Sequence, residues 1–513
     1  MTVDTAEEMN SKVQLLDLIQ GLVMLTADES KALMVEVSGV SMDSRGVGHG
    51  DLFIACFGTH HDARDYIVDA IGQGAAAVLA ESSKRWQGLR TIDGVPVIAV
   101  DALAAKMSLI SSRFYSDPST QLTVIGITGT NGKTSCSQFI AQILNEMNHR
   151  CGIIGTLGYG SFGDLKQTHL TTPDAVFTQA ALAEMLHRDL DPVVMEVSSV
   201  GLHQHRVAAV HFDTAIFTNL SRDHLDYHAN MEDYASSKRK LFTMEGLRCA
   251  IVNLDDPYAL SMLNAVSSDV EVLTYSCSNR SASVYAANLQ FTETGYSATI
   301  NTPLGCGHIA GALLGAFNFS NVLAVASAVI AYLGETRTIA IDELCRQLSA
   351  LRPVKGRMEL IGQESDITAV VDYAHTPEGL RSALVALRQH FNGKIWCVFG
   401  CGGNRDKGKR PLMGEVAERY ANRLIITDDN PRYEDANEIV QHIRSGIGNK
   451  APVTVIRDRA AAIDYAVANA ESDDVVLVAG KGHESSQEIN GEKYLFSDAN
   501  QVRLAIHKRN GSS

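Results

Sequence analysis

The sequence predicts an α/β protein of three domains: an N-terminal α/β domain, a central parallel-sheet domain and a C-terminal Rossmann-like domain. The chain has 513 residues, which is too long for one compact core. A glycine-rich loop directly follows an apolar run near residue 127. Strand-like and helix-like segments then alternate through the middle and again through the last third of the chain. We place the domains at residues 1–112, 113–352 and 353–513.

The composition is that of an ordinary globular protein, with 45% hydrophobic and 20% charged residues. A net charge of -15 argues against a general nucleic-acid binder, which needs a basic surface. The N-terminus lacks the pattern of a signal peptide, and charges or glycines interrupt every apolar stretch short of a membrane span. We therefore expect a cytoplasmic protein without membrane insertion.

The nine cysteines are scattered, and no paired CxxC spacing indicates zinc. Cys397 and Cys401 are the closest pair, but they flank an apolar run and indicate a strand and its loop. We interpret all nine as reduced thiols.

In the first domain, residues 51–57 read as a strand and residues 66–74 as a helix. The central domain begins with an apolar strand at residues 122–127, followed by strands at 193–197 and 214–218. The last domain is predicted from strands at residues 368–372, 395–399, 424–427, 453–456 and 475–479, with a helix near 379–390.

The loop Gly-Thr-Asn-Gly-Lys-Thr at residues 129–134 has the pattern of a phosphate-binding loop. Backbone N–H groups and a helix N-terminus face the anion, and Lys133 neutralises the outer phosphates. The standard loop needs glycine at position 127, where this chain has Ile127, so the loop is a compact variant. The alternative is a glycine turn before an ordinary helix. The candidate ATP-binding residues here are Gly129, Thr130, Asn131, Gly132, Lys133, Thr134 and Ser135.

Three further positions indicate a magnesium site beside this loop. Thr134 supplies a hydroxyl where phosphate-loop proteins ligate magnesium. Glu196 ends an apolar strand, so its carboxylate is expected at the sheet edge, although such a residue can also be a solvated end or helix cap. The run at residues 218–228 holds two histidines and two aspartates, which makes a metal role for His224 plausible beside the alternative of a polar loop.

Six motifs, taken in order, resemble those of the Mur ligase family, whose members use ATP to join an amine to a carboxylate. They cover almost the whole chain, and no single one is decisive. The motifs are G-T-N-G-K-T at 129–134, E-V-S-S at 196–199, the run at 218–228, G-A-F-N at 315–318, G-R-M-E at 356–359 and D-Y-A-H-T-P at 372–377.

The resemblance implies that UDP binds the first domain, ATP the second and an amino acid the third. It implies that Lys238 is carbamylated (N6-carboxylysine) and ligates Mg²⁺ with Thr134, Glu196 and His224. Asn318 is then expected near the adenine, with Arg357 and Asp372 contacting the nucleotide from the third domain. ATP lies between two domains that close on it. The catalytic residues expected from the family are Lys133, Glu196, His224 and Lys238.

Within the family, the chain resembles the members that add the third residue of the peptidoglycan stem peptide. Two departures are Leu170, where asparagine is common, and Val200, where histidine is frequent, so a substrate contact at 170 stays open. The resemblance implies contacts to a UDP-muramoyl dipeptide by Met42, Ser44, Thr59, His60, His61, Thr171, Thr172, Ser198, Gln204 and Arg206.

Three loops after strands in the third domain predict an amino-acid site. An arginine fork binds a carboxylate in a bidentate way, so Arg405 and Arg432 together with Glu484 suit a zwitterion with an additional carboxylate. The plain alternative is a turn with an exposed cation. The motif D-N-P-R also resembles that of the members that add meso-diaminopimelate rather than lysine. The candidate residues are Arg405, Asp429, Asn430, Pro431, Arg432, Gly480 and Glu484.

The expected reaction begins with phosphorylation by ATP of the D-glutamate γ-carboxylate of UDP-N-acetylmuramoyl-L-alanyl-D-glutamate. The amine of meso-diaminopimelate then attacks the acyl phosphate. We expect a monomer that acts on small-molecule substrates only. Alternatives are a folylpolyglutamate synthetase, a murein-peptide recycling ligase, and a non-catalytic ATP-binding regulatory protein.

Overall fold

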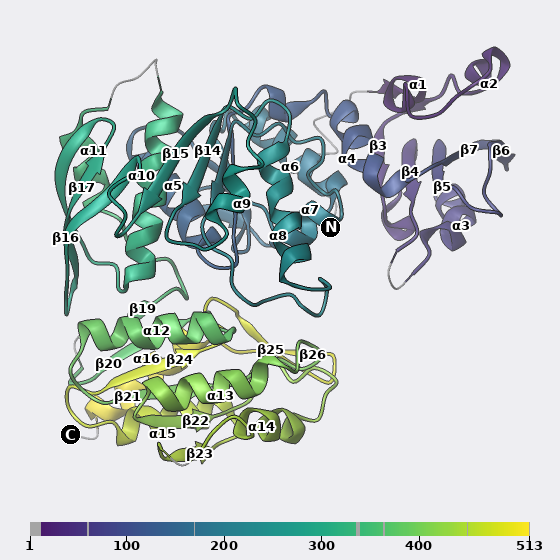
Figure 1. Ribbon diagram of the computed structural model, residues 1–513. Coiled ribbons are helices and arrows are strands. Elements are labelled where there is room, and N and C mark those ends of the chain that lie inside the picture. Colours follow the sequence, from purple (N-terminus) through teal and green to yellow (C-terminus); the bar gives the residue numbers. More distant parts are fainter. Residues whose placement is uncertain are drawn as a thin grey trace.

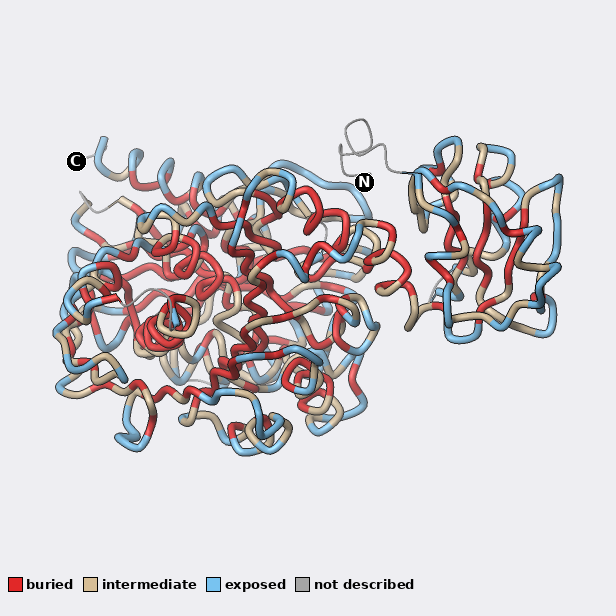
Figure 2. The backbone as a smooth tube through the Cα atoms, turned by 90° about the horizontal axis from the view of Figure 1, so that it is seen from above, coloured by how far each residue is buried: buried red, intermediate tan, exposed pale blue. Residues whose placement is uncertain are grey.

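The computed structural model describes residues 12–58, 61–168, 170–334, 339–362, 365–448 and 450–511. Figure 1 shows three α/β bodies: the N-terminal one to one side, the central one beside it and the C-terminal one beneath the central one. The strands of the three large sheets carry buried residues. Figure 2 shows buried backbone running through the interior, with exposed segments around it. The predicted fold class is confirmed.

The N-terminal body is a five-stranded sheet in the order β3-β4-β5-β7-β6. Its pairs are parallel except for β6 with β7. Leu52, Phe53 and Ile54 on β4 are all buried because both faces of the strand are covered. The elements are β1 (Val13–Gln14), α1 (Leu15–Ile19), α2 (Ala27–Ala32), β2 (Glu36–Val37), β3 (Gly39–Ser41), β4 (Asp51–Ala55), α3 (Ile67–Gly72), β5 (Ala77–Glu81), β6 (Leu89–Ile92) and β7 (Val95–Val100).

Helix α4 (Leu103–Phe114) joins the N-terminal body to the central one and runs across residue 112, where we place the boundary. Its Ser108 hydroxyl accepts a hydrogen bond from the Ala209 amide at 3.0 Å. Ser119, in the turn η4 (Pro118–Thr120), accepts one from the His211 amide at 3.0 Å. Ser108 therefore forms a buried contact between the two domains, and Ser119 fixes the start of the central domain to its own body.

The central sheet has eleven strands in the order β11-β10-β9-β12-β8-β13-β14-β15-β16-β17-β18. Strands β9 to β16 of this order are parallel, and the two ends add antiparallel strands. The strands are β8 (Val124–Thr128), β9 (Gly152–Gly155), β10 (Gly158–Ser161), β11 (Asp164–Lys166), β12 (Val193–Glu196), β13 (Thr214–Phe217), β14 (Cys249–Asn253), β15 (Glu271–Ser276), β16 (Val284–Thr292), β17 (Gly295–Thr302) and β18 (Gly305–Gly311).

Helices cover both faces of the central sheet, because alternate residues of its buried strands are apolar on each side. Ile125 and Ile127 pack with α5 (Lys133–Glu146) and α10 (Ala316–Leu333), whereas Val124 packs on the opposite face. That face is covered by α6 (Ala175–His187), α8 (Met231–Arg239) and α9 (Ala259–Leu263), and α7 (Ser199–His203) follows β12. Helix α11 (Ile341–Ser349) lies beside β18 and packs on the same side as α5 and α10.

Helix α10 is long and apolar enough, by length and composition, to cross a membrane. However, 67% of it is buried inside the protein, against α5 and the central sheet. Packing in the core therefore accounts for its apolar residues.

The C-terminal sheet has the order β19-β20-β24-β21-β22-β23, with β19 antiparallel at the edge. Three of its strands begin and end where the sequence predicted: β20 (Thr368–Asp372), β21 (Ile395–Phe399) and β24 (Val475–Ala479). The other elements are β19 (Glu359–Ile361), β22 (Arg423–Ile426), β23 (Val453–Val455), the hairpin β25 (Ser486–Ile489) and β26 (Glu492–Leu495), α12 (Pro377–His390), α13 (Lys409–Tyr420), α14 (Ala436–Arg444), α15 (Arg459–Asn469) and α16 (Asp498–Gly511).

Candidate active site

The glycine-rich loop leaves β8 at Thr128 and enters α5 at Lys133. Gly129 (φ +152) and Gly132 (φ +90) have backbone angles that other residues rarely adopt, and a side chain on Gly129 would collide with Thr218. Asn219 O and Oδ1 accept the amides of Thr130 and Asn131 at 2.8 and 3.0 Å. An anion therefore meets the amides in the first turn of α5, which have no partner within the helix.

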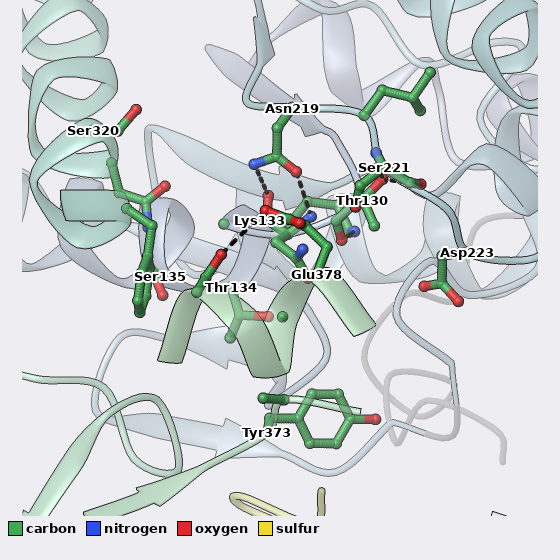
Figure 3. A pocket seen from close by; sticks show the side chains of 18 of the residues that line it. Thr130, Lys133, Thr134, Ser135, Asn219, Ser221, Asp223, Ser320, Tyr373 and Glu378 are labelled. Carbon is green, nitrogen blue, oxygen red and sulfur yellow. Dashed lines mark hydrogen bonds between the residues drawn. The ribbon is translucent and has the colours of Figure 1, made fainter. Parts of the chain in front are cut away.

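Lys133 folds back over its own loop. Its ammonium donates to the carbonyls of Gly129 at 2.7 Å and Thr130 at 2.9 Å, and burial lowers the pKa of Lys133. Thr134 Oγ1 donates to Glu196 Oε2 at 2.9 Å. Figure 3 shows Lys133, Thr134 and Asn219 gathered at the loop, with Tyr373 and Glu378 facing them from the C-terminal domain.

Lys238, on α8, shares the Gly129 carbonyl with Lys133, at 2.8 Å. Its ammonium also lies 4.5 Å from the centre of the Tyr234 ring. Burial first, and then the charge of Lys133, holds the pKa of Lys238 well below its usual range. The structure therefore favours the uncharged amine of Lys238 more than a surface site does.

His224 lines the cavity beside this loop, with its Nε2 3.6 Å from Asp223 Oδ2. Burial lowers the pKa of His224, which favours the neutral ring. Within the described residues, no three His, Cys, Asp or Glu side chains gather as a metal site. Mg²⁺ needs only one or two protein oxygen ligands, and Thr134 Oγ1 with the Glu196 carboxylate provides them, so these residues fit the ion.

The C-terminal domain completes the site with Arg357. Its Nη2 donates to Thr134 Oγ1 at 3.1 Å, across the two domains, and its guanidinium lies 4.5 Å from the Tyr373 ring centre. The Nε of Arg357 is buried without a hydrogen-bond partner, as an anion-binding donor would be. Asp372 accepts the amides of Met358 and Ala374 at 2.7 and 2.8 Å, and so holds the segment that carries Arg357. Burial raises the pKa of Asp372.

Between the two domains lies a cavity of about 570 Å³. Asn318, expected near the adenine, is buried and donates to Leu314 O at 2.9 Å; it does not line this cavity. Several residues without a role predicted from the sequence do line it, and most of them lie within or beside the motifs: Thr156, Asn219, Asp223, Asn253, Phe317, Asn321 and His375.

The residues expected to contact the dipeptide surround Glu196. Thr172 Oγ1 donates to Glu196 O at 2.8 Å and accepts the Ser198 amide at 2.9 Å. Arg206 donates to Thr172 O at 2.7 Å and to Gln204 Oε1 at 2.6 Å. Thr171 Oγ1 lies 3.0 Å from Thr156 Oγ1, which in turn donates to Glu196, and Leu170 is exposed.

The residues expected to bind uridine lie in the N-terminal body. Met42 packs partly against its core, Ser44 begins the turn η2 (Ser44–Gly46), and His61 is exposed. Thr59 and His60 lie outside the described residues. Figure 1 shows this body to one side of the other two, and none of its described residues lines the cavity, so the residues expected to bind uridine are separate from it.

The loops after β21, β22 and β24 bring the seven predicted amino-acid-site residues together. Gly402 lies against both Arg405 and Arg432, and Pro431 lies against the neighbouring Gly403. Gly480 packs on the Asp429 carboxylate. Asn430 Nδ2 donates to Glu484 Oε2 at 2.9 Å.

Two contacts join this cluster to the cavity. Arg222, in the same loop as His224, lies 3.7 Å from Asp406, the neighbour of Arg405. The Tyr373 ring contacts both Arg357 and His483, and His483 precedes Glu484. The predicted phosphate site and the predicted amino-acid site are therefore neighbours, although none of the seven amino-acid-site residues lines the cavity itself.

Three family models match the chain: "Mur ligase family, catalytic domain" over residues 36–115, "Mur ligase middle domain" over 127–329, and "Mur ligase, glutamate ligase domain" over 356–482. The chain therefore belongs to the Mur ligase family, as its motifs predicted.

Curated relatives of high identity share one name, UDP-N-acetylmuramoyl-L-alanyl-D-glutamate–2,6-diaminopimelate ligase. The one from Pseudomonas aeruginosa is 47% identical and covers 91% of this chain and 94% of its own length. The one from Coxiella burnetii is 45% identical over 94% and 99%. A solved structure of a ligase of that name has a TM-score of 0.69 at 33% identity, covering 98% and 100%. MurF from Acinetobacter baumannii shares the fold, with a TM-score of 0.65 at 17% identity over 92% and 96%.

Proposed function

We propose that this chain joins meso-2,6-diaminopimelate to the D-glutamate γ-carboxylate of UDP-N-acetylmuramoyl-L-alanyl-D-glutamate, driven by ATP. The name shared by relatives of nearly full length supports this substrate set. One structural observation carries the mechanism. Arg357 of the C-terminal domain donates to Thr134 of the phosphate loop at 3.1 Å, so both domains act on the same bound nucleotide.

The protein catalyses the reaction by positioning the reactants and by stabilising the charge that develops on them. A γ-carboxylate oxygen attacks the γ-phosphorus of ATP and ADP leaves, which gives an acyl phosphate; the substrate amine then attacks the acyl carbon and expels phosphate. Lys133 and the amides at the start of α5 bind the phosphate charge, and Arg357 approaches it from the other domain. Thr134 and Glu196 would hold Mg²⁺, with His224 lining the same cavity, and the bound ion would supply further charge neutralisation.

We assign the γ-carboxylate to the cluster around Glu196. Thr172, Ser198 and Arg206 are already joined there by hydrogen bonds, next to the phosphate loop. The side-chain partner of Arg206 is Gln204, which is neutral, so the positive charge of Arg206 suits an acidic peptide. The uridine contacts belong to the N-terminal domain, through Met42, Ser44 and the segment that includes His61.

Lys238 is proposed to carry a carbamate. Its lowered pKa favours the neutral amine, which is the form that attacks CO₂ and then loses a proton to give a carboxylate-like group. Labelling with ¹³C-bicarbonate tests this without an activity assay. A carbamate signal is expected in the wild type and not in Lys238→Arg; equal spectra contradict the modification.

Arg432 is proposed to select the amino acid by binding its distal carboxylate, with Arg405 beside it. Lysine presents only an ammonium there and leaves the guanidinium without a substrate partner, which costs roughly a thousandfold in selectivity. We further propose that the enzyme works as a cytoplasmic monomer on these small-molecule substrates. The nine free thiols agree with a reducing compartment.

Release of phosphate from ATP, measured with Mg²⁺, the UDP-dipeptide and a panel of amino acids, tests the proposal. Release is expected only when the UDP-dipeptide and diaminopimelate are both present. Turnover with a folate and glutamate favours a folylpolyglutamate synthetase, and turnover with free tripeptide favours a recycling ligase. Absence of turnover in every mixture favours a regulatory ATP-binding protein.

A further inference from the structure

The β25–β26 hairpin covers the arginine of the amino-acid site. The Arg432 amide donates to Glu488 O at 3.1 Å, and the Asn490 amide donates to Arg432 O at 2.8 Å. The Glu488 amide donates to Asn430 Oδ1 at 3.0 Å. Because these bonds attach the backbone of Glu488 to the D-N-P-R motif, its side chain lies beside Arg432.

The carboxylate of Glu488 forms an ion pair with Arg432. Its Oε2 lies 3.2 Å from Arg432 Nε, while Arg432 Nη1 donates to Gly403 O at 2.9 Å. The two side chains are 28% and 22% exposed, so the pair faces solvent at the mouth of the site rather than the core. A substrate carboxylate that binds Arg432 therefore arrives next to Glu488.

Glu484, the carboxylate that the sequence predicted for this site, already has buried partners. Glu484 lies 2.7 Å from the ammonium of Lys481, which is fully buried, and it also accepts the Asn430 amide group. Removing Glu484 from Lys481 would leave a buried charge without its partner, which is costly. Glu488 can change partners at a much lower cost, because its side chain reaches solvent.

We propose that Glu488 is a specificity-determining residue that accepts the distal ammonium of the amino-acid substrate while Arg432 binds the distal carboxylate. This inference rests on the proposed function. The distal end of diaminopimelate carries both charges on one carbon, so both ions of the free pair receive a new partner. The distal ammonium of lysine can pair with Glu488, but lysine offers no carboxylate to Arg432. A substrate without the distal amine can pair with Arg432, but it offers no ammonium to Glu488. Either leaves one charge desolvated and unmatched.

The variant Glu488→Gln tests this with two substrates, diaminopimelate and 2-aminopimelate, which lacks the distal amine. Phosphate release gives kcat/KM for each, and their ratio does not depend on how much protein is folded. The ratio of kcat/KM for diaminopimelate to kcat/KM for 2-aminopimelate is expected to fall about tenfold. The cause is a higher KM for diaminopimelate, with kcat little changed. The KM values for ATP and the UDP-dipeptide stay those of the wild type.

Glu492→Gln is the matched control on the same hairpin. Its carboxylate is exposed and accepts the Tyr494 hydroxyl at 2.6 Å, so the substrate ratio should not change. A wild-type ratio in Glu488→Gln overturns the inference. An equal gain in affinity for both substrates also overturns it, because Glu488 would then only compete with the substrate carboxylate for Arg432. If the wild type releases no phosphate with diaminopimelate, the proposed function itself fails.

Discussion

The loop after β8 and the loops after β21, β22 and β24 all follow parallel strands, yet they hold their charges in different ways. In the first, Lys133 and Lys238 both donate to the carbonyl of Gly129. In the second group, the cations pair with carboxylates: Arg432 with Glu488, Lys481 with Glu484 and Arg410 with Glu434.

We infer that the phosphate loop binds any phosphate group, whereas the C-terminal loops select among amino acids. Because Lys133 donates to backbone carbonyls, no carboxylate has to be displaced before it meets a phosphate, and the adjacent amides add donors that no side-chain mutation removes. Cations bound to carboxylates accept a ligand only if it satisfies both members of the pair. We therefore expect mutations near β8 to reduce the reaction with every amino acid, and mutations in the C-terminal loops to change which amino acid is used.

The largest effect is expected from Lys133→Ala. It removes the cation nearest the transferring phosphoryl group, so kcat should fall about a thousandfold with every amino acid tested. Steady-state phosphate release measures this, with the exposed Lys31→Ala as the control. A change confined to one amino acid would contradict the division between the two regions.

Arg432→Ala is expected to change which amino acid the enzyme uses. Loss of the guanidinium leaves the substrate carboxylate and Glu488 without a counter-charge, so the KM for diaminopimelate should rise about a hundredfold. Selectivity over lysine should fall with it, while the KM for ATP should not change. Arg419→Ala, exposed on α13, is the control. Unchanged selectivity would remove Arg432 from the specificity site.

Glu434 is expected to hold the loops of the amino-acid site in place and so to contribute to the free energy of unfolding. It accepts two hydrogen bonds from Arg410, which is fully buried, at 2.7 and 2.8 Å, and it accepts the Asn404 amide beside Arg405. Glu434→Gln leaves the guanidinium without its anion, and the free energy of unfolding should fall by about 3 kcal/mol. Chemical denaturation at pH 7 measures this, with Glu232→Gln, in an exposed ion pair, as the control.

The same pair predicts a pH dependence. The hydrogen bonds from Arg410 hold the pKa of Glu434 below its usual range. The stabilisation is therefore present above the unfolded pKa of about 4.3 and is lost as the pH falls toward the folded value. From about pH 5 downward, the wild type should lose stability more steeply than Glu434→Gln. Parallel curves would contradict this role for Glu434.

The smallest effect is expected from Arg222→Ala, at the contact between the two regions. Arg222 lies 3.7 Å from Asp406 and is 48% exposed, and such pairs contribute little. We expect kcat/KM for diaminopimelate to change by no more than about threefold. A much larger loss in the same phosphate assay would show that the two regions depend on each other more than their contacts indicate.

The sequence was sufficient to predict the parts of the site that follow strands. The strand ends at Asp372, Phe399 and Ala479 lie where the apolar runs end, because a buried parallel strand reads as a continuous apolar run. The loops that follow such strands meet at one edge, so Arg432 and Glu484 could be grouped before their contacts were known.

Contacts between distant segments could not be predicted in this way. Nothing in the G-R-M-E motif indicates that Arg357 reaches Thr134, because that contact depends on how two domains pack. Asn318 and Asn321 lie one helical turn apart, and only the packing of α10 shows that Asn321 faces the cavity. Likewise, Glu488 lies on a short hairpin whose position over Arg432 is set by tertiary hydrogen bonds.

Transfer of ¹⁸O tests the central claim most directly. If the D-glutamate γ-carboxylate of the UDP-dipeptide is labelled with ¹⁸O, attack on ATP passes one of its oxygens to the phosphoryl group. Phosphate released with diaminopimelate should then contain one ¹⁸O atom per molecule, as measured by mass spectrometry. Phosphate without label, released at the same rate, would contradict activation of the carboxylate by phosphoryl transfer.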